Sequence, residues 1–590
     1  MSIQLFKITV TLFSLSLSCI AKDTITITAD TFEGRKDNTK DNGDKFTGNV
    51  TITTNGVRIT SNLATREKRN NTDMFTIYDT VTIEKPEDNV VITAERIEVL
   101  EGRDDITISE KVCCKRDDMV FTSDVCKYNL KTNMATYNSG GTLVKPSDNI
   151  TVHSRRGEAD LKTTGFILSD AVEVSTEEFV IHCDMIEYKK SEDKLIAKGN
   201  IKVDIKKRKD EFITTSEQIE YHPTNKTLVA KRGIYHSSTY LLAAESLLYD
   251  QENEQLKFDD GFEMIFNNKL RFTCNKAIYD TKKKHGETYG DTVLYDMTAT
   301  ENKYLYLCAD KFSFDITNTN NNDQEEATDE LDTIQLDSLT MEEVCNEEVK
   351  EENTAPQQQP AEENKDTSVN TTSPKGTIVI EGEGKVQFCS NSFQGCSDSI
   401  RFVNNKILLP NKTILWNANN MIIGSNIVIL MSMGAISKVK VLQEPLFVNI
   451  DSIGFSNQVS ANMMTANVKD NNITKALFTT NVDTFYFLIR DNNLTGVNRL
   501  QCSKFFLLFN KEKLKNIYFN DKIYGNFYFP DYASNNKTQL LLDRLLQERD
   551  FIQNTSMPAL EEIKKKVKTV SLISDKDLEE LFKEHKKDIS

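Results

Sequence analysis

The chain has 590 residues, and its net charge of −17 excludes a nucleic-acid partner, because binding a phosphate backbone requires clustered Lys and Arg. Hydrophobic residues make up only 38% of the chain, while Phe (31) and Tyr (18) are plentiful. This composition favours a thin interior built from sheets over the roughly four compact domains that length alone suggests.

The first 21 residues read as a secretory signal peptide. Lys7 precedes an apolar stretch from Ile8 to Leu17, and small residues follow up to Ala21. The stretch of about 10 residues is too short to span a bilayer, which takes roughly 20. We predict export with cleavage after Ala21. Acylation of Cys19 is the alternative, although Ser16 stands where a lipobox prefers an aliphatic residue.

From residue 27 onward a short phrase recurs every 28 to 41 residues, with one longer gap. In each copy a small residue precedes a polar marker, the position two after the marker is mostly apolar, and the position four after it is often aromatic. The markers are Asp30, Asn62, Glu95, Asp124, Arg155, Asp184, Glu217, Glu245, Asn275, Asp310, Asp398, Asn426, Asn462 and Ser503. This period-two pattern predicts β-strands, and its recurrence predicts a stacked repeat protein.

A second alternating run follows each phrase, so each repeat supplies about two strands. Glycines in or beside these runs predict sharp bends from one sheet to a facing one; they are Gly48, Gly141, Gly199, Gly233, Gly261 and Gly290. Stacking aligns equal positions along the axis, so the apolar positions form stripes. The candidate lining of an apolar groove is Phe32, Ile97, Ile186, Ile219, Leu247, Phe312, Ile400, Val428, Met464 and Phe505.

The row of marker carboxylates and amides allows two interpretations. A calcium site needs several oxygens that converge from neighbouring loop positions, and the Gly and Asp alternation typical of such loops is missing. We therefore favour a solvated strand edge whose charges oppose edge-to-edge pairing.

The 11 cysteines include no C-x-x-C pair and no spacing suited to zinc, so we expect neither a metal nor a cofactor. Export permits a disulfide between Cys389 and Cys396 or between Cys113 and Cys114. We favour buried, unpaired thiols, because several cysteines occupy the small position before a marker.

The repeats are interrupted once and end before the C-terminus. Residues 318–374 are acidic, rich in Gln, Asn and Thr and nearly free of aromatics, which predicts a disordered insertion. The predicted repeat regions therefore comprise residues 22–317 and residues 375–532. Residues 533–590 have helical periodicity and predict short amphipathic helices that cap the last strand, with recruitment of a partner as the alternative.

The phrases ITADTF, FTGNVTITTNGVRITSN and ITAERIEV resemble the OstA (organic solvent tolerance) family, which includes LptA and the N-terminal domain of LptD. The phrases CSDSIRF and ILWNANNMIIGSNIVIL are similar to the long OstA-like proteins of Bacteroidetes. The resemblance implies an all-β, elongated β-jellyroll, or β-taco: two facing sheets, open along one side, that shelter lipopolysaccharide acyl chains in the periplasm. Arg66 and Glu158 depart from the pattern where apolar or aromatic residues are expected.

The sequence thus predicts a non-enzymatic lipid-transport protein of outer-membrane biogenesis, with lipopolysaccharide or another envelope lipid as ligand and LptC- or LptD-like bridge proteins as partners. The alternative is a structural or adhesive β-solenoid with a filled core. An enzyme is disfavoured, because the carboxylates recur at a structural position instead of converging on one cleft.

Overall fold

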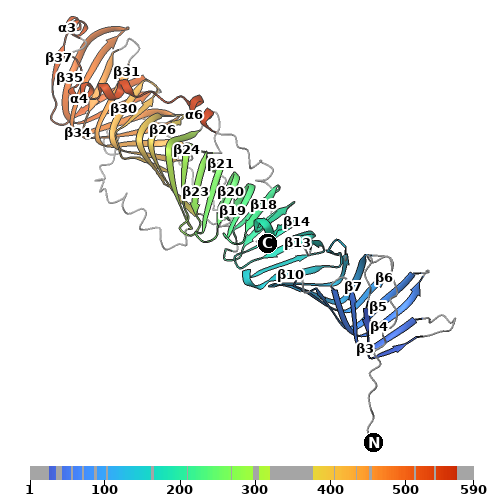
Figure 1. Cartoon of the computed structure of the whole chain (residues 1–590). Coiled ribbons are helices and arrows are strands. Elements are labelled where there is room, and N and C mark those ends of the chain that lie inside the picture. The colour runs from blue at the N-terminus through green and yellow to red at the C-terminus, as the bar shows by residue number, and fades with distance from the viewer. Residues whose placement is uncertain are drawn as a thin grey trace, which may run out of the picture.

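The computed structural model describes residues 26–318, 376–536 and 540–567, apart from short turn segments within these ranges, among them 35–42, 161–164 and 451–454. All 37 strands belong to one hydrogen-bonded, antiparallel sheet that is folded into two facing layers and stacked into a long, twisted body (Figure 1). The predicted all-β, elongated fold is confirmed. Among the described residues, no helix is both long and apolar enough to cross a membrane.

The body is described in three regions. The N-terminal region contains β1 Thr26–Thr28, β2 Thr31–Glu33, β3 Gly43–Thr54, β4 Val57–Arg69, β5 Thr72–Lys85, β6 Val90–Leu100, β7 Asp105–Arg116 and β8 Met119–Asn129. The junction contains β9 Met134–Tyr137, β10 Gly141–Lys145, β11 Ile150–Ser154, β12 Arg156–Asp160 and β13 Phe166–Ser175.

The packed region begins with β14 Phe179–Lys189, β15 Lys194–Lys198, β16 Ile201–Ile205, β17 Phe212–Thr215, β18 Gln218–His222, β19 Thr227–His236, β20 Tyr240–Asp250, β21 Gln255–Phe266, β22 Leu270–Cys274, β23 Lys276–Asp280, β24 His285–Asp296 and β25 Leu305–Asn318. It continues with β26 Gly376–Ser390, β27 Gln394–Val403, β28 Lys406–Leu409, β29 Thr413–Asn417, β30 Asn420–Ser432, β31 Ala435–Ile450, β32 Ser456–Ser460, β33 Met463–Lys469, β34 Asn472–Arg490, β35 Asn493–Asn510, β36 Lys513–Asn520 and β37 Tyr524–Tyr528.

Each repeat changes layer at a short left-handed bend. Four of the predicted glycines lie at such bends: Gly48, Gly199, Gly261 and Gly290 have φ of 80°, 73°, 104° and 74°. Elsewhere Asp, Asn or Lys adopts the same conformation, as at Asp79 and Asp170. Strand pairing shifts by one register step at the bends, for example between Tyr78 and Val81. The bend therefore acts as a β-bulge that folds a long strand over the core.

Because consecutive strands run antiparallel, their hairpin turns lie alternately along two rims of the folded sheet. The first rim includes the turns near Arg208, Ser392 and Asn417, and the second includes those near Glu254 and Asn471. The rims touch: an ion pair of 3.2 Å joins Arg208 to Glu254, and the Ser392 hydroxyl donates to Asn471 Oδ1 at 3.1 Å. The packed region is therefore closed at these points along the side that the family pattern leaves open.

The sheet continues across the acidic segment. β25 and β26, which flank it, pair from Leu305 with Ser390 to Asn318 with Gly376. The predicted insertion lies outside the described residues; it connects two paired strands at the second rim. The two predicted repeat regions are thus joined in one sheet.

The C-terminal tail forms the short helices α3 Pro530–Asn535, α4 Asp543–Gln547, α5 Arg549–Asn554 and α6 Leu560–Lys566. Leu540 and Leu542 pack with Ile414, Ile423 and Phe485 on the outer face of one layer, and α6 reaches back to β24 and β25 (Figure 1). The tail covers the last strands only in part: Tyr532 of α3 stacks on Tyr528 of β37 with ring centroids 5.4 Å apart, whereas Tyr524 of β37 remains 68% exposed. Outward-facing apolar residues of β29 to β34 attract the tail.

Candidate functional site

The interior is divided into two hydrophobic cores that separate at the junction. The core of the N-terminal region runs from Val50 to Tyr128 and is almost wholly aliphatic, with Tyr128 as its one buried aromatic among the described residues. The other core runs from Ile150 to Phe509. An apolar cavity lies between them.

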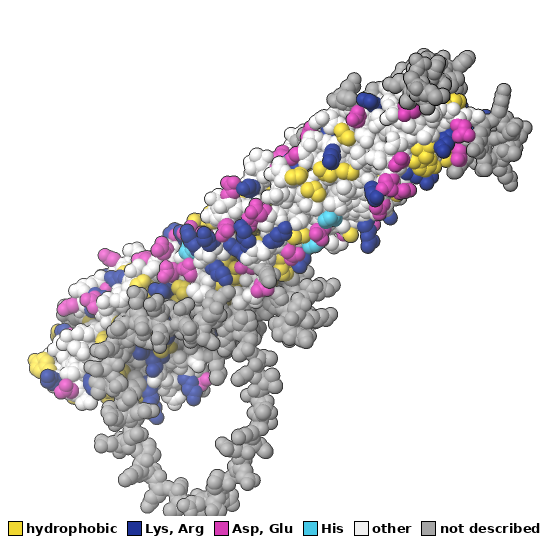
Figure 2. Space-filling view, turned by 90° about the horizontal axis from the view of Figure 1, so that it is seen from below, with side chains coloured by type: hydrophobic (Ala, Val, Ile, Leu, Met, Phe, Trp, Pro, Cys, Tyr) yellow, Lys and Arg dark blue, Asp and Glu magenta, His cyan; other side chains and the backbone are white. Residues whose placement is uncertain are grey.

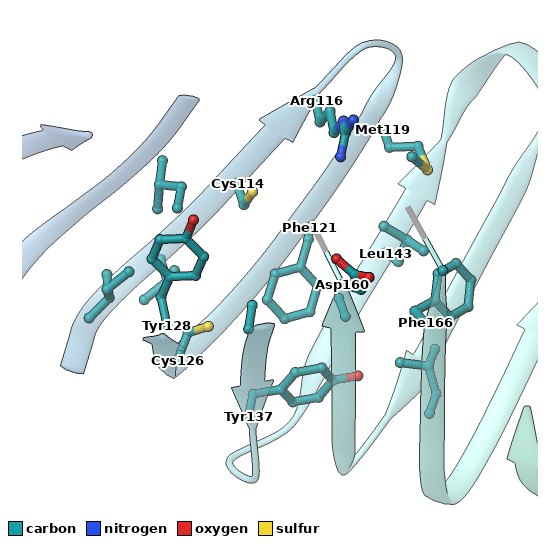
Figure 3. A pocket seen from close by; sticks show the side chains of 17 residues that line it. Cys114, Arg116, Met119, Phe121, Cys126, Tyr128, Tyr137, Leu143, Asp160 and Phe166 are labelled. Atoms are coloured by element: carbon teal, nitrogen blue, oxygen red, sulfur yellow. The ribbon is translucent and has the colours of Figure 1, made fainter. Parts of the chain in front are cut away.

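The cavity has a volume of about 100 Å³ and is lined by side chains of β6 to β13 (Figure 3). Its lining is predominantly aliphatic, aromatic and thiol; the lining residues are Ile92, Ile108, Val112, Cys114, Arg116, Met119, Phe121, Cys126, Tyr128, Ala135, Tyr137, Leu143, Ala159, Asp160, Gly165, Phe166 and Leu168. Dry cavities of about 150 Å³ with Leu, Ile and Phe walls bind small apolar molecules. This space suits the end of one acyl chain.

Short strands and glycines at the junction open this space. The long strands of the N-terminal region give way to pieces of four or five residues in β9 to β12. The ring of Tyr137 fills the positions where Gly141 and Gly157 would carry a Cβ atom. Its hydroxyl hydrogen-bonds Ser154, and its ring centroid lies 4.9 Å from that of Phe121. Tyr137 thus forms one wall of the cavity and packs against the core that begins at Ile150.

The wall also contains thiol and charged groups, among them Cys114, Cys126, Arg116 and Asp160. Burial raises the pKa of the Cys114 thiol to about 11 and that of Cys126 to about 12. Both thiols are therefore protonated near neutral pH, whereas the thiolate is the nucleophile. Arg116 and Asp160 line different parts of the same cavity (Figure 3).

Most of the predicted groove residues lie in the packed interior and not beside open space. Their exposures are 0% for Ile97, Ile186, Ile219, Leu247 and Phe312, 1% for Met464 and Phe505, and 2% for Ile400. None of the ten lines the cavity. The alternation therefore located inward-facing positions, but it carried no information about where packing fails.

Two of the predicted groove residues do not lie in the interior. Phe32 is 41% exposed at the N-terminal end, where it stacks on Phe46. Val428 faces away from its buried neighbours Ile427 and Ile429. The physical reason is the left-handed Asn426 (φ 52°), with a register shift just before it, which puts this strand one residue out of phase.

The sequence missed the cavity walls, namely Cys114, Phe121, Tyr137, Leu143 and Phe166 among others. The available signal was the crowding of glycines at 140, 141 and 157 within one repeat. Glycine inside a strand marks a bend or a close approach, and here it marks the place where an aromatic ring crosses the backbone.

The markers stabilise the bends of the next repeat. The backbone N–H of Asp30 donates to the Gly48 carbonyl at 2.8 Å, and Asn49 Nδ2 donates to the Asp30 carboxylate at 2.8 Å. The same pair recurs at Asp184, with distances of 3.0 Å and 2.9 Å to Gly199 and Asn200. Among the described residues, no group of three or more His, Cys, Asp or Glu side chains could hold a metal ion.

None of the nine cysteines in the described ranges forms a disulfide, and six of them are buried. Neither pairing that export permits, Cys389 with Cys396 or Cys113 with Cys114, is formed. The interpretation of these residues as small buried hydrophobes is confirmed for Cys126, Cys183, Cys274, Cys308, Cys389 and Cys502.

The two departures from the repeat pattern both lie where charge is accommodated. Arg66 pairs with Asp73 and with Asp44 at 3.7 Å, and its guanidinium lies 5.7 Å from the centre of the Phe75 ring. Glu158 is exposed on β12, close to the cavity. Charges of both signs are interspersed along the face shown in Figure 2.

A long folded antiparallel sheet with an apolar cavity between two cores defines an elongated, all-β repeat fold. Residues 22–184 match the family described as OstA-like protein, so the resemblance is confirmed for this segment, which contains the N-terminal region and the cavity. This family is associated with lipopolysaccharide transport and organic-solvent tolerance. The closer likeness to Bacteroidetes proteins stays a prediction. No curated protein matches the sequence.

Proposed function

We propose that this protein is an exported, periplasmic carrier that shelters acyl chains of lipopolysaccharide or another envelope lipid during outer-membrane biogenesis. The observation that carries the proposal is the apolar cavity between the two cores, inside the segment that matches the OstA-like family. Withdrawing apolar surface from water contributes about 25 cal/mol per Å², so an acyl chain binds there without any chemistry.

Under this proposal the protein is not an enzyme, and its partners are other lipid-transport bridge proteins of LptC or LptD type. The N-terminal region and the junction hold lipid. The packed region acts as a stiff, closed extension that sets the span of the body.

Photo-crosslinking in cells tests the proposal. A photoreactive residue at Phe121 or Leu143 faces the cavity, whereas one at Ile219 or Leu247 faces packed side chains. We expect lipid adducts at the first pair and none at the matched second pair. Absence of adducts at all four positions contradicts lipid carriage.

A structural β-solenoid is the second candidate, and one observation favours it. The largest fully buried side chains, such as Phe272, Tyr279 and Phe312, all lie between Phe179 and Phe478 and fill the interior there. If the cavity captures no lipid, the filled interior supports a structural role instead, as a rigid rod in the cell envelope.

A further inference from the structure

A second hollow adjoins the cavity at the second rim. It has a volume of about 440 Å³ and shares Asp160, Gly165 and Phe166 with the cavity. Met134, Ile167 and Tyr188 also line it. The two hollows are therefore neighbours, one inside the folded sheet and one at its edge.

The hollow at the rim is amphipathic. On its apolar side Phe166 stacks on Tyr188 with ring centroids 5.0 Å apart, and Ile167 is 44% exposed. On its polar side Glu158 is exposed, and Lys189 pairs with Glu187 at 3.7 Å. Solvent-exposed apolar side chains beside a group of charged ones are typical of a site that binds an amphiphile.

The cavity is blocked along the axis of the body in both directions. On its N-terminal side lies the core that contains Ile97 and Ile108, and on its other side lies the core that contains Val174 and Phe179, all with 0% exposure. An acyl chain that arrived along the axis would have to displace these close-packed side chains. The rim offers a path that leaves both cores intact.

We propose that the rim hollow is a lateral mouth through which a single acyl chain enters the cavity, while its polar head stays in water beside Glu158 and Lys189. The ligand class is an amphiphile with one free chain, such as a lysophospholipid or a fatty acid, because the cavity of about 100 Å³ takes the end of one chain. This inference rests on the proposed function and adds the direction of loading and the chain number.

Fluorescence quenching reads the orientation of the chain. The single Trp416 is changed to Phe, and a new Trp is placed either at the mouth (Tyr188→Trp) or deep in the cavity (Phe121→Trp). The probe is lysophosphatidylcholine with a nitroxide near its head or near its chain end. We expect the head-proximal nitroxide to quench the mouth Trp more strongly, and the chain-end nitroxide to quench the deep Trp more strongly.

The outcomes separate the two proposals. The reverse order, or equal quenching by both probes, shows that the lipid binds without its head at the rim hollow, which overturns the lateral mouth alone. Absence of saturable quenching at both positions overturns the proposed function as well. Wild-type Trp416, which lies on the outer face beneath the tail, serves as the control for unspecific binding and should remain unquenched.

A matched pair of surface variants tests the mouth without touching the cavity wall. Ile167→Glu alters the mouth, and Ile278→Glu alters a comparable residue, 36% exposed, on β23. We expect slower association of the lysolipid only for Ile167→Glu, with thermal unfolding of both variants close to that of the wild type. Equal association rates for the two variants would exclude loading through this rim.

Discussion

The N-terminal region and the packed region are built from the same two-strand repeat, yet their interiors differ. The first buries mainly Val and Ile, whereas the second buries Phe and Tyr in the equivalent stripes. Polar contacts join the rims in both, for example Lys85 with Asn133 at 2.8 Å and Arg208 with Glu254 at 3.2 Å. Close-packed interiors lose stability when atoms are removed, and loosely packed ones have space to accept a ligand. One backbone pattern therefore gives an interior filled by large side chains in one region and an apolar cavity at the border with the other.

The largest expected effect on stability comes from truncating an equivalent isoleucine in each region to alanine. Ile219 and Ile108 are both 0% exposed, but only Ile108 borders the cavity. We expect Ile219→Ala to cost about 4 kcal/mol of unfolding free energy and Ile108→Ala about 2 kcal/mol, because Ile108 has fewer close neighbours to lose. Urea unfolding followed by segment-resolved hydrogen exchange measures both. Equal losses would show that the junction is as tightly packed as the remainder.

Alkaline titration probes the closed rim. Burial raises the pKa of Tyr240 from 10.0 to about 12, and its hydroxyl lies 2.7 Å from that of Tyr279. Because the folded pKa is the higher one, this contribution is complete below pH 10 and is lost as the pH rises from 10 toward 12. Across this pH window we expect the unfolding free energy of the wild type to fall by about 2 to 3 kcal/mol more than that of Tyr240→Phe.

Tyr137→Phe at the junction is the matched control for that titration. Burial also raises the pKa of Tyr137, but its ring is only half-buried. The difference in unfolding free energy between the wild type and Tyr137→Phe should therefore change less with pH than the corresponding difference for Tyr240→Phe. A larger change at Tyr137 would contradict the assignment of the tighter interior to the packed region.

Enlarging a buried side chain should change the stability of the protein in opposite directions in the two regions. Ala135 lines the cavity, whereas Ala230 is 0% exposed in the packed region. We expect Ala135→Val to stabilise the protein by about 1 kcal/mol and Ala230→Val to destabilise it by about 1 to 3 kcal/mol. Differential scanning calorimetry gives the sign directly. Ala135→Val should also reduce lipid adducts at Phe121.

The marker positions should give the smallest effect, and the same one in both regions. Asp30→Ala and Asp184→Ala each remove a carboxylate that accepts from the next bend, so each should cost about 0.5 to 1 kcal/mol. Asp30→Asn and Asp184→Asn keep an acceptor oxygen and serve as controls. A much larger loss at either site, read from the same unfolding curves, would assign the marker more than a bend-stabilising role.

The repeat phrase was sufficient to predict strands, two facing layers and the inward positions, because a period of two determines which side of a sheet each residue faces. Eight of the ten residues that it predicted to face inward are buried, whereas Phe32 is exposed at the N-terminal end and Val428 faces outward, where one left-handed residue changed the phase. The repeat pattern did not predict the closed rim, because Arg208 and Glu254 are 46 residues apart in the chain and meet only when it folds back.

The sequence by itself determined the architecture, the bends and the apolar stripes, since these depend on local alternation and on residues that tolerate a positive φ. Only the tertiary structure decided where the inward-facing apolar side chains leave a cavity between them. The ring of Tyr137 crosses Gly141 and Gly157 and forms a wall of the cavity at the border between the two cores. Packing density depends on side chains far apart in the chain, and no local pattern encodes it.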